Sequence, residues 1–318
     1  MATALLVNYF NGARVLLKQV LSRHNSLEVI PNCEGQVAIV TGGNKGIGYE
    51  TVKGLCKAHM TVIMACRDVK AADKAIKELK EELPQANVEY MELDLGSLAS
   101  VRKFVTNFRK KGLPLHILVN SAGIMFPPYG TTEDGFELQF GVNHLGPFAL
   151  TNLLLEDLIK SGLTGRFSRI VTLSSEAHVP GTINFEDLQS KSYYSPYLGY
   201  SQSKLANILF TYELQRCLKE QNSPVTANVL HPGVVNTDLF QHIHWIVRIP
   251  QSVLAYFLFK TPKQGADNSI YVALSHELEG TGGRYFVNCH SAQSSDESYR
   301  EDVQRRLWKI SCQLTGVS

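Results

Sequence analysis

The chain has 318 residues, a formal net charge of +2 and a hydrophobic content of 44%. This length can bury the core of one α/β domain with a short extension, and the nearly balanced charge argues against nucleic acid as a partner. The six cysteines are scattered, with no CxxC pair and no histidine at metal-ligand spacing. We therefore expect no metal site and a reduced, cytosol-facing environment.

The N-terminal stretch at 4–21 carries apolar side chains at helical spacing, interrupted by Asn8, Arg14 and Lys18. It is too polar for a confident membrane span, which needs about 20 mostly apolar residues. We expect residues 1–30 to be a membrane-association segment whose amphipathic helix lies in the membrane interface. The alternative is a helix that packs on its own domain or on a partner.

From Gly35 onward, apolar runs alternate with amphipathic segments. The apolar runs predict strands at 36–42, 59–67, 88–95, 115–123, 169–175, 226–233 and 282–288. The amphipathic segments predict helices at 47–58, 69–83, 98–111, 133–159 and 198–220. This alternation predicts a single α/β domain over 35–318, with a Rossmann-type, doubly wound parallel sheet covered by helices on both faces.

The first predicted strand runs through a glycine-rich turn, TGGNKGIG, directly into a helix. Glycines let the backbone approach a pyrophosphate, and the helix N-terminus offers it N–H groups and a positive dipole end. A structural turn is the alternative, but the strand–turn–helix setting favours a dinucleotide site. The expected cofactor residues in this turn are Gly42, Asn44, Lys45, Gly46, Ile47 and Gly48.

The second predicted strand ends at Arg67, and an acid, Asp68, follows only after it. NAD-binding folds usually place an acid at this strand end for the ribose 2′-hydroxyl, whereas an arginine accommodates the 2′-phosphate of NADP. Arg67, with Lys45 as a second cation, therefore favours NADP(H), while NAD(H) stays open. The alternative is that Arg67 is a solvated surface charge.

Tyr200 and Lys204 are four residues apart on a predicted helix, so they share one face. A nearby ammonium group lowers the pKa of a phenol, and Tyr200 could then exchange a proton with an alcohol or a carbonyl. Ser175, at the carboxyl end of its predicted strand, can donate a hydrogen bond to the substrate oxygen. Ser174 is the alternative for this role.

Several motifs occur in order along the chain: TGGNKGIG, NSAG (120–123), VNHLG (142–146), YSQSK (200–204) and HPGVVNT (231–237). With them the chain resembles the short-chain dehydrogenase/reductase family over roughly residues 35–290. ACRD (65–68) and SKLANILF (203–210) resemble its retinol-dehydrogenase-like branch. The stretches HPGVVNTDLFQHIHW and FKTPKQGA look like the members that interconvert long isoprenoid alcohols and aldehydes.

The resemblance implies roles for individual residues. Tyr200 would be the acid/base, Ser175 would bind the substrate oxygen, and Lys204 would hold the nicotinamide ribose. Asn143 would complete the catalytic set by supporting a water-mediated proton path; without the family pattern it would be a structural residue. Besides Tyr200, Lys204 and the glycine turn, the implied cofactor contacts are Asp94, Leu95, Asn120, Ala122, Gly123, Val234 and Thr237. The family more often has asparagine at Ser121, and we expect the histidines His144, His178 and His231 to be structural.

The apolar and aromatic segment 243–259 covers the substrate pocket in this family, although core or dimer packing is an alternative and a homo-oligomer stays open. We expect a hydrophobic alcohol and its aldehyde or ketone as substrates, above all a long isoprenoid. Retinol and retinal, or another lipid carbonyl, are the alternative, and a cofactor-binding scaffold without turnover is the alternative of another class. The expected location is a membrane surface, at the endoplasmic reticulum or a lipid droplet, with the catalytic domain facing the cytosol.

Overall fold

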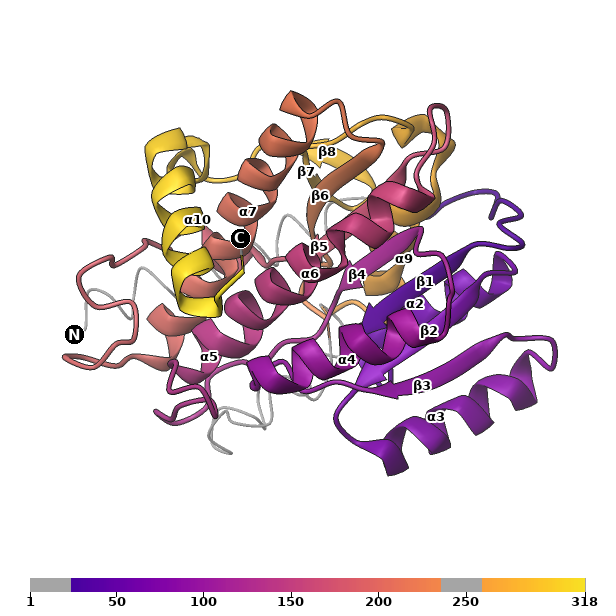
Figure 1. Cartoon of the computed structure of the whole chain (residues 1–318), viewed down its shortest axis with the longest axis horizontal. Helices are drawn as coiled ribbons and strands as arrows, with labels where there is room; N and C mark the ends of the chain where they lie inside the picture. The colour runs from indigo at the N-terminus through magenta and orange to yellow at the C-terminus, as the bar shows by residue number, and fades with distance from the viewer. Residues whose placement is uncertain (1–23, 236–258, 318) are drawn as a thin grey trace.

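An eight-stranded sheet runs through the centre of the molecule in the order β3-β2-β1-β4-β5-β6-β7-β8 (Figure 1). The computed structural model describes residues 24–235 and 259–317. Strands β1 to β7 are parallel, and β8 is antiparallel to β7. The strands are β1 (Val37–Thr41), β2 (Thr61–Cys66), β3 (Val88–Glu92), β4 (Ile117–Asn120), β5 (Ser168–Leu173), β6 (Val225–His231), β7 (Tyr285–Val287) and β8 (His290–Ala292).

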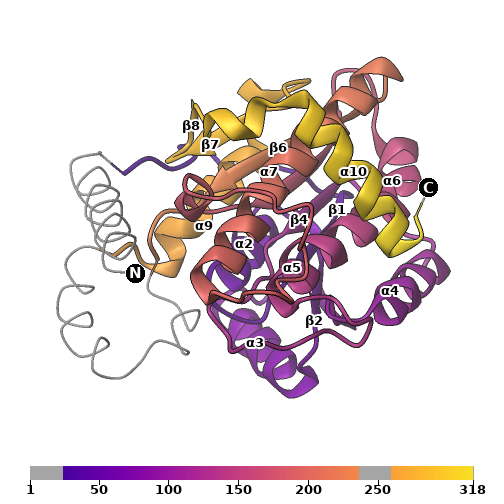
Figure 2. The same cartoon turned by 90° about the vertical axis from the view of Figure 1, so that its left-hand side faces the viewer.

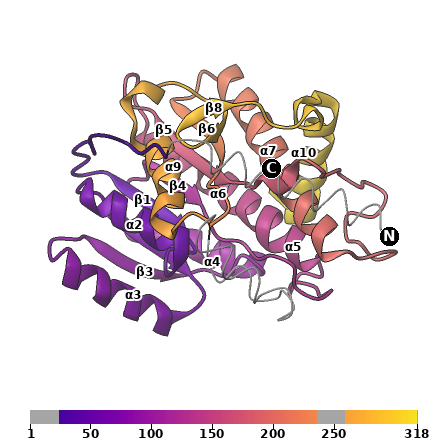
Figure 3. The same cartoon turned by 180° about the vertical axis from the view of Figure 1, so that it is seen from behind.

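Helices cover both faces of this sheet. One face carries α4 (Leu98–Lys110), α6 (Gly146–Ser161) and α7 (Pro196–Glu220), which lie in front of the sheet in Figure 1. The other face carries α2 (Gly46–Lys57), α3 (Val69–Glu82) and α9 (Pro262–Leu274), as Figures 2 and 3 show from two further sides. The predicted single α/β domain with a doubly wound parallel sheet is therefore confirmed.

Strand β1 shows why both faces need cover. Ala38 and Val40 pack with residues of α2 and α9, whereas Val37 and Ile39 pack with residues of α4 and α6. Successive side chains of a strand point to opposite faces, so an unbroken apolar run buries both of them. The apolar run of β1 therefore specifies a strand in the interior of the sheet.

The strand order reverses between β1 and β4. Strand β1 pairs with β2 on one side and with β4 on the other, so the chain winds outward in both directions from this point. In open α/β sheets, ligands bind in the crevice outside the carboxyl ends of the strands at such a reversal. The fold thus places its binding crevice beside the turns that follow β1 and β4.

The helix predicted at 133–159 is wrong in its first part. The structure has a turn there: the backbone N–H of Thr132 donates to the oxygen of Phe136, and the Thr132 oxygen accepts the N–H of Gly135. Gly135 has a φ of +83°. The short helix α5 (Leu138–Phe140) begins only where the Glu137 carboxylate caps it, and a π-helical turn (Gly141–Leu145) connects it to α6. The apolar spacing of the sequence is helical from residue 133 onward. The left-handed backbone at Gly135 and the cap at Glu137 nevertheless delay the start of the helix to Leu138.

The C-terminal part of the chain contains elements that the sequence patterns did not predict. Helix α9 begins with a capping box between Thr261 and Gln264. Helix α10 (Glu301–Thr315) buries Val303 and Leu307 and packs on α7 and α6 (Figure 2).

The amphipathic helix expected at 4–21 lies outside the described residues. Within the described ranges, no helix combines the length and the apolar character needed to cross a membrane.

Arg169 of β5 ties the end of α9 to the sheet. The residue is 6% exposed, and its guanidinium donates to the backbone oxygens of Ala273 at 3.2 Å and Ser275 at 2.8 Å. It also pairs with Glu279 at 3.1 Å. Helix α9 has no basic residue in its last turn, so Arg169 supplies the positive charge that a helix C-terminus favours.

Arg169→Leu should lower the free energy of unfolding by about 3–5 kcal/mol, because Glu279 and the α9 carbonyls lose a buried partner. Urea denaturation at neutral pH measures this loss. Arg305→Leu is the matched control: its pair with Glu301 is exposed, so its loss should cost less than about 1 kcal/mol. Equal losses in the two variants would contradict the role given to Arg169.

Candidate active site

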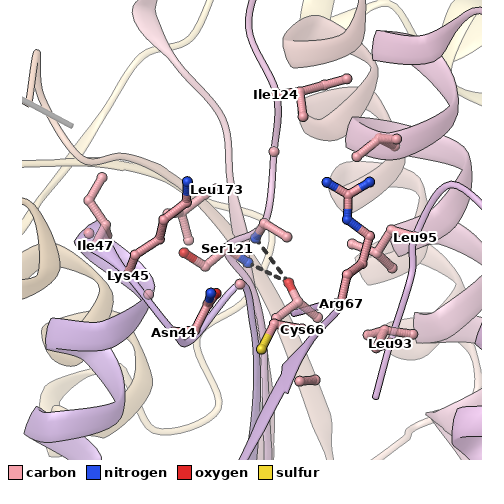
Figure 4. A pocket seen from close by; sticks show the side chains of 18 of the residues that line it. Asn44, Lys45, Ile47, Cys66, Arg67, Leu93, Leu95, Ser121, Ile124 and Leu173 are labelled. Carbon is pink, nitrogen blue, oxygen red and sulfur yellow. Dashed lines mark hydrogen bonds between the residues drawn. The ribbon is translucent and has the colours of Figure 1, made fainter. Parts of the chain in front are cut away.

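A cavity of about 560 Å³ opens at the carboxyl ends of the strands, where the strand order reverses (Figure 4). Among the residues predicted from the sequence, the following line it: Gly42, Asn44, Lys45, Gly46, Ile47, Gly48, Arg67, Asp94, Leu95, Ala122, Gly123, Tyr200 and Lys204. The glycine turn, the end of β2 and both ends of the YSQSK motif thus meet around one space.

The two ends of the glycine turn approach each other so closely that a side chain would not fit between them. A Cβ atom on Gly48 would lie 2.2 Å from the backbone oxygen of Gly42, and Gly42 itself has a φ of +66°. No side chain caps the N-terminus of α2 among the described residues. Backbone N–H groups that no side chain covers, at the positive end of a helix, fit the pyrophosphate of a dinucleotide.

Thr41 joins the turn after β1 to the turn after β4. Its Oγ1 accepts hydrogen bonds from the backbone N–H groups of Ser121 and Ala122, each at 3.0 Å, as the dashed lines in Figure 4 show. These bonds are made by the backbone, so the serine at position 121 does not prevent them. A hydroxyl on β1 therefore fixes the wall of the cavity beside β4.

Arg67 and Lys45 lie on opposite sides of the cavity (Figure 4). The side chain of Arg67 is 68% exposed, and its Nη1 lies 3.8 Å from Oδ2 of Asp94. Asp68 also lines the cavity, but its Oδ1 accepts the backbone N–H of Ala71 at 3.0 Å and so caps α3. The acid that follows Arg67 in the sequence is therefore engaged in capping a helix.

Tyr200 and Lys204 project from α7 into the inner part of the site, and both are buried. The Nζ atom of Lys204 lies 5.5 Å from the centre of the Tyr200 ring. It donates to the backbone oxygen of Leu173, the last residue of β5, at 3.3 Å. The four-residue spacing brings the two groups to the same place, as the sequence predicted.

Burial dominates the proton affinity of both groups. It lowers the pKa of Lys204 from 10.5 to about 8. It raises the pKa of Tyr200 above its usual range, against the smaller effect of a hydrogen bond with Ser175. The prediction of a lowered phenol pKa is therefore wrong for this structure, because removal from water is the larger influence. At neutral pH the Tyr200 hydroxyl keeps its proton and can act as an acid.

The two neighbouring serines have different partners. Ser174 is buried, and its Oγ donates to the backbone oxygen of Lys204 at 2.7 Å. Ser175 is half-buried; its Oγ accepts from the backbone N–H of Ala177 at 3.2 Å, and its side chain lies close enough to Tyr200 to lower the pKa of that phenol. The hydroxyl proton of Ser174 is thus used in a hydrogen bond to the α7 backbone, whereas the Ser175 side chain lies beside the phenol of Tyr200.

Asn143 sits in the π-helical turn and holds the chain that follows Gly123. Its Oδ1 accepts the backbone N–H of Ile124 at 2.8 Å, and its Nδ2 donates to the Ile124 oxygen at 2.9 Å and to Ser203 at 3.0 Å. A Cβ on Gly123 would lie 3.2 Å from Asn143 Oδ1 and 3.5 Å from Lys204 Nζ. Its part in a proton path stays a prediction.

Two described residues expected at the cofactor do not line the cavity. Asn120 turns away and donates to Thr151 of α6 at 2.9 Å. Val234 is described but does not line the cavity. Thr237 and most of the segment 243–259 lie outside the described residues.

Phe126 is a site residue that sequence reasoning missed. Its ring meets that of Tyr200 edge-on with 5.4 Å between ring centres, and its φ is +58°, which is rare for a bulky residue. The Gln139 side chain accepts its backbone N–H at 2.9 Å and so fixes this conformation. A left-handed phenylalanine leaves no sequence pattern, so no signal could have found it.

The three histidines near the motifs are buried and hydrogen-bonded within the fold. His144 packs among aromatic rings, and its Nε2 lies 2.9 Å from the hydroxyl of Ser311 on α10. Burial lowers its pKa to about 3, so the ring is neutral at physiological pH. His178 and His231 bond to the segment that carries Ser175.

A crevice of this kind, with a glycine turn at one end and a buried tyrosine and lysine at the other, is that of an α/β oxidoreductase with a nicotinamide cofactor. The chain belongs to the short chain dehydrogenase family, whose pattern it matches over residues 36–245. Its curated relatives include polyprenol and retinol dehydrogenases, and the chain is accordingly an oxidoreductase that acts on alcohol groups.

Among known proteins, the chain is similar to polyprenol dehydrogenase of Homo sapiens, with 48% identity over 99% of this chain and 97% of that protein. It is also similar to retinol dehydrogenase 14 of Mus musculus, with 45% identity over 89% of this chain and 86% of that protein. A solved structure of an uncharacterized protein from Mycobacterium Paratuberculosis matches with a TM-score of 0.74 and 36% identity, over 92% of this chain and 98% of that one.

Lys204→Met should raise the free energy of unfolding at neutral pH by roughly 1–3 kcal/mol. The reason is that a lysine pKa lowered to about 8 implies a cost on the order of 3 kcal/mol for the buried charge. Between pH 8 and 10.5 the unfolded chain binds the extra proton, so the wild type gains stability with pH and the difference shrinks. Urea unfolding of both proteins at about pH 7 and about pH 9.5 measures this. A variant less stable at both pH values would contradict it.

Proposed function

We propose that the chain interconverts a hydrophobic alcohol and its carbonyl compound, with a long isoprenoid alcohol and aldehyde as the substrate class. The observation that carries the chemistry is that Tyr200 and Lys204, both buried, line the inner end of the cavity, with Ser175 next to Tyr200. The substrate class follows the relatives, since polyprenol dehydrogenases from Homo sapiens and Danio rerio reach 48% and 46% identity. Retinol dehydrogenases at 45% make retinol and retinal the second candidate.

In the proposed reaction the nicotinamide cofactor supplies or accepts a hydride. Ser175 donates a hydrogen bond to the substrate oxygen and fixes its position beside Tyr200. During reduction Tyr200 gives its proton to that oxygen, which suits a phenol whose pKa burial has raised. During oxidation the phenolate form of Tyr200 takes the proton from the alcohol and becomes a phenol again; until that transfer, the ammonium group of Lys204 stabilises the phenolate.

We propose NADP(H) as the cofactor, with NAD(H) as the alternative. Arg67 lines the cavity at the end of β2 with an exposed guanidinium, and Lys45 lies across from it. The acid that could hold a ribose hydroxyl there, Asp68, is engaged as the cap of α3. Two cations at the cavity, together with an acid after β2 that caps a helix, favour a 2′-phosphate.

The membrane assignment also belongs to this proposal. The predicted helix at 4–21 and the apolar segment 243–259 would place the catalytic domain on the cytosolic surface of the endoplasmic reticulum or of a lipid droplet. All six cysteines are free thiols, which suits a reducing compartment. A long isoprenoid could then pass from the lipid to the site without crossing water.

Arg67→Asp should lower the ratio of kcat/KM with NADPH to that with NADH by about 10–100-fold, because a charge-assisted contact to the 2′-phosphate is lost. Lys70→Asp makes the same charge change in the first turn of α3, on an exposed residue that does not line the cavity. Its ratio should stay near that of the wild type. The same shift in both variants, or in neither, would rule out specific recognition by Arg67.

The reaction itself is tested by NADPH-dependent reduction of three carbonyl compounds: farnesal, retinal and a steroid ketone. We expect the highest kcat/KM with farnesal and a loss of about 10²–10⁴-fold in kcat for Tyr200→Phe. Tyr197→Phe, on the same helix, is the control and should keep its activity. Higher kcat/KM with retinal would favour the second candidate, and binding of cofactor without turnover of any compound would indicate a scaffold.

A further inference from the structure

Both ends of one peptide group beside the active site are held by histidine rings. This group joins Ser175 to Glu176. Its carbonyl oxygen accepts the Nδ1–H of His178 at 2.7 Å, and its N–H donates to Nδ1 of His231 at 3.3 Å. The backbone N–H of His178 donates to the same carbonyl at 3.0 Å.

The partners of each ring determine which nitrogen carries the proton. A carbonyl oxygen only accepts, so Nδ1 of His178 is protonated, and Nε2 of the same ring accepts the backbone N–H of Ser295 at 3.0 Å. His231 accepts through Nδ1, so that atom carries no proton. Burial lowers the pKa of both rings, to about 4 for His231, which keeps them in these neutral forms.

The segments that meet here are far apart in the sequence. His231 is the last residue of β6, and Ser295 follows β8. The ring of Tyr285 of β7 meets that of His178 edge-on with 5.2 Å between ring centres, and the Tyr285 hydroxyl donates to Glu176 at 3.3 Å. His178 and His231 are 1% and 5% exposed, so the peptide group is fixed inside a packed region.

This peptide group determines where the Ser175 side chain stands. Ser175 supplies the carbonyl, so its Cα lies next to the clamped group. Its Oγ already accepts the N–H of Ala177, and a hydroxyl has only one proton to donate. The Ser175 side chain also lowers the pKa of the Tyr200 phenol, so the two hydroxyl groups lie close together.

We propose that His178 and His231 are positioning residues that hold the Ser175 hydroxyl in line with Tyr200 and the substrate oxygen. The inference rests on the proposed function, in which Ser175 binds that oxygen. A displacement of about 1 Å at a reacting group can cost on the order of 10²-fold in rate. A purely structural histidine would affect folding but not the rate.

The chain offers a matched control for that distinction. His116 is also buried, at 8% exposure, and its Nδ1 accepts the backbone N–H of Val37 at 3.1 Å. It precedes β4, and Val37 begins β1, so this bond lies at the opposite end of the sheet. His116→Leu removes the same kind of bond far from the cavity.

The first experiment compares His231→Leu, His231→Asn and His116→Leu by kcat and KM for farnesal, KM for NADPH and thermal melting. We expect His231→Leu to lower kcat by about 10–100-fold with an unchanged KM for NADPH. His231→Asn places an amide oxygen near the site of Nδ1 and should recover kcat to within about threefold. His116→Leu should lower the melting temperature but not kcat. His178→Asn keeps an N–H donor for the Ser175 carbonyl oxygen, so its kcat should likewise be higher than that of His178→Leu.

The second experiment is a double-mutant cycle with Ser175→Ala, measured as single turnovers with enzyme in excess so that slow rates stay measurable. In the Ser175→Ala background, His231→Leu should change the rate by less than about twofold, because the group it positions is gone. If Ser175→Ala keeps the wild-type rate, the role of Ser175 in the proposed function fails, and this inference fails with it. Suppose that Ser175→Ala is slow but His231→Leu lowers the rate by the same factor in the Ser175→Ala background as in the wild type. The role of Ser175 then stands and the positioning role is overturned. The positioning role is likewise overturned if His231→Leu and His116→Leu lower the rate equally.

Discussion

Keeping the ammonium group of Lys204 away from water is the constraint around which the active-site side of the fold is arranged. A buried charge needs hydrogen-bond acceptors, and the backbone oxygen of Leu173 is the one supplied, with Asn207 donating to the same oxygen at 3.2 Å. That contact is made only when α7 lies in a fixed register against the end of β5. The packing of α7 on the sheet and of α10 on α7 holds this register, so residues far from the cavity support the position of Nζ.

The cavity has two unlike ends. Where the phosphates would lie, its walls are backbone N–H groups and exposed cations, and the Arg67 side chain is 68% exposed. Where the reacting atoms would meet, Tyr200 is 4% exposed and Phe126 covers its ring. Charges act weakly in water and strongly in the interior, so the outer end can select a cofactor with little effect on the chemistry at the inner end.

Much of this arrangement could be predicted from the sequence, since it depends on local patterns. Apolar runs alternating with amphipathic segments predicted every strand except β8 and most helices. The glycine turn and the Tyr200–Lys204 spacing predicted residues that meet at the cavity. What could not be predicted depends on contacts between distant segments. The histidine contacts around the Ser175–Glu176 peptide join β6 and the segment after β8 to the segment after β5. The sign of the Tyr200 pKa shift depends on burial, which no motif reveals.

The π-helical turn at Gly141–Leu145 has a consequence for how this family of chains can vary in length. It lies between α5, whose cap is fixed by Glu137, and α6, which buries a long face against the sheet. Each residue of an α-helix advances the side chains by about 100° around the axis. Deleting one residue here would therefore turn Asn143 away from Ile124 or rotate the buried face of α6 toward solvent. Insertions and deletions that survive selection should avoid this segment and collect in the turn before it.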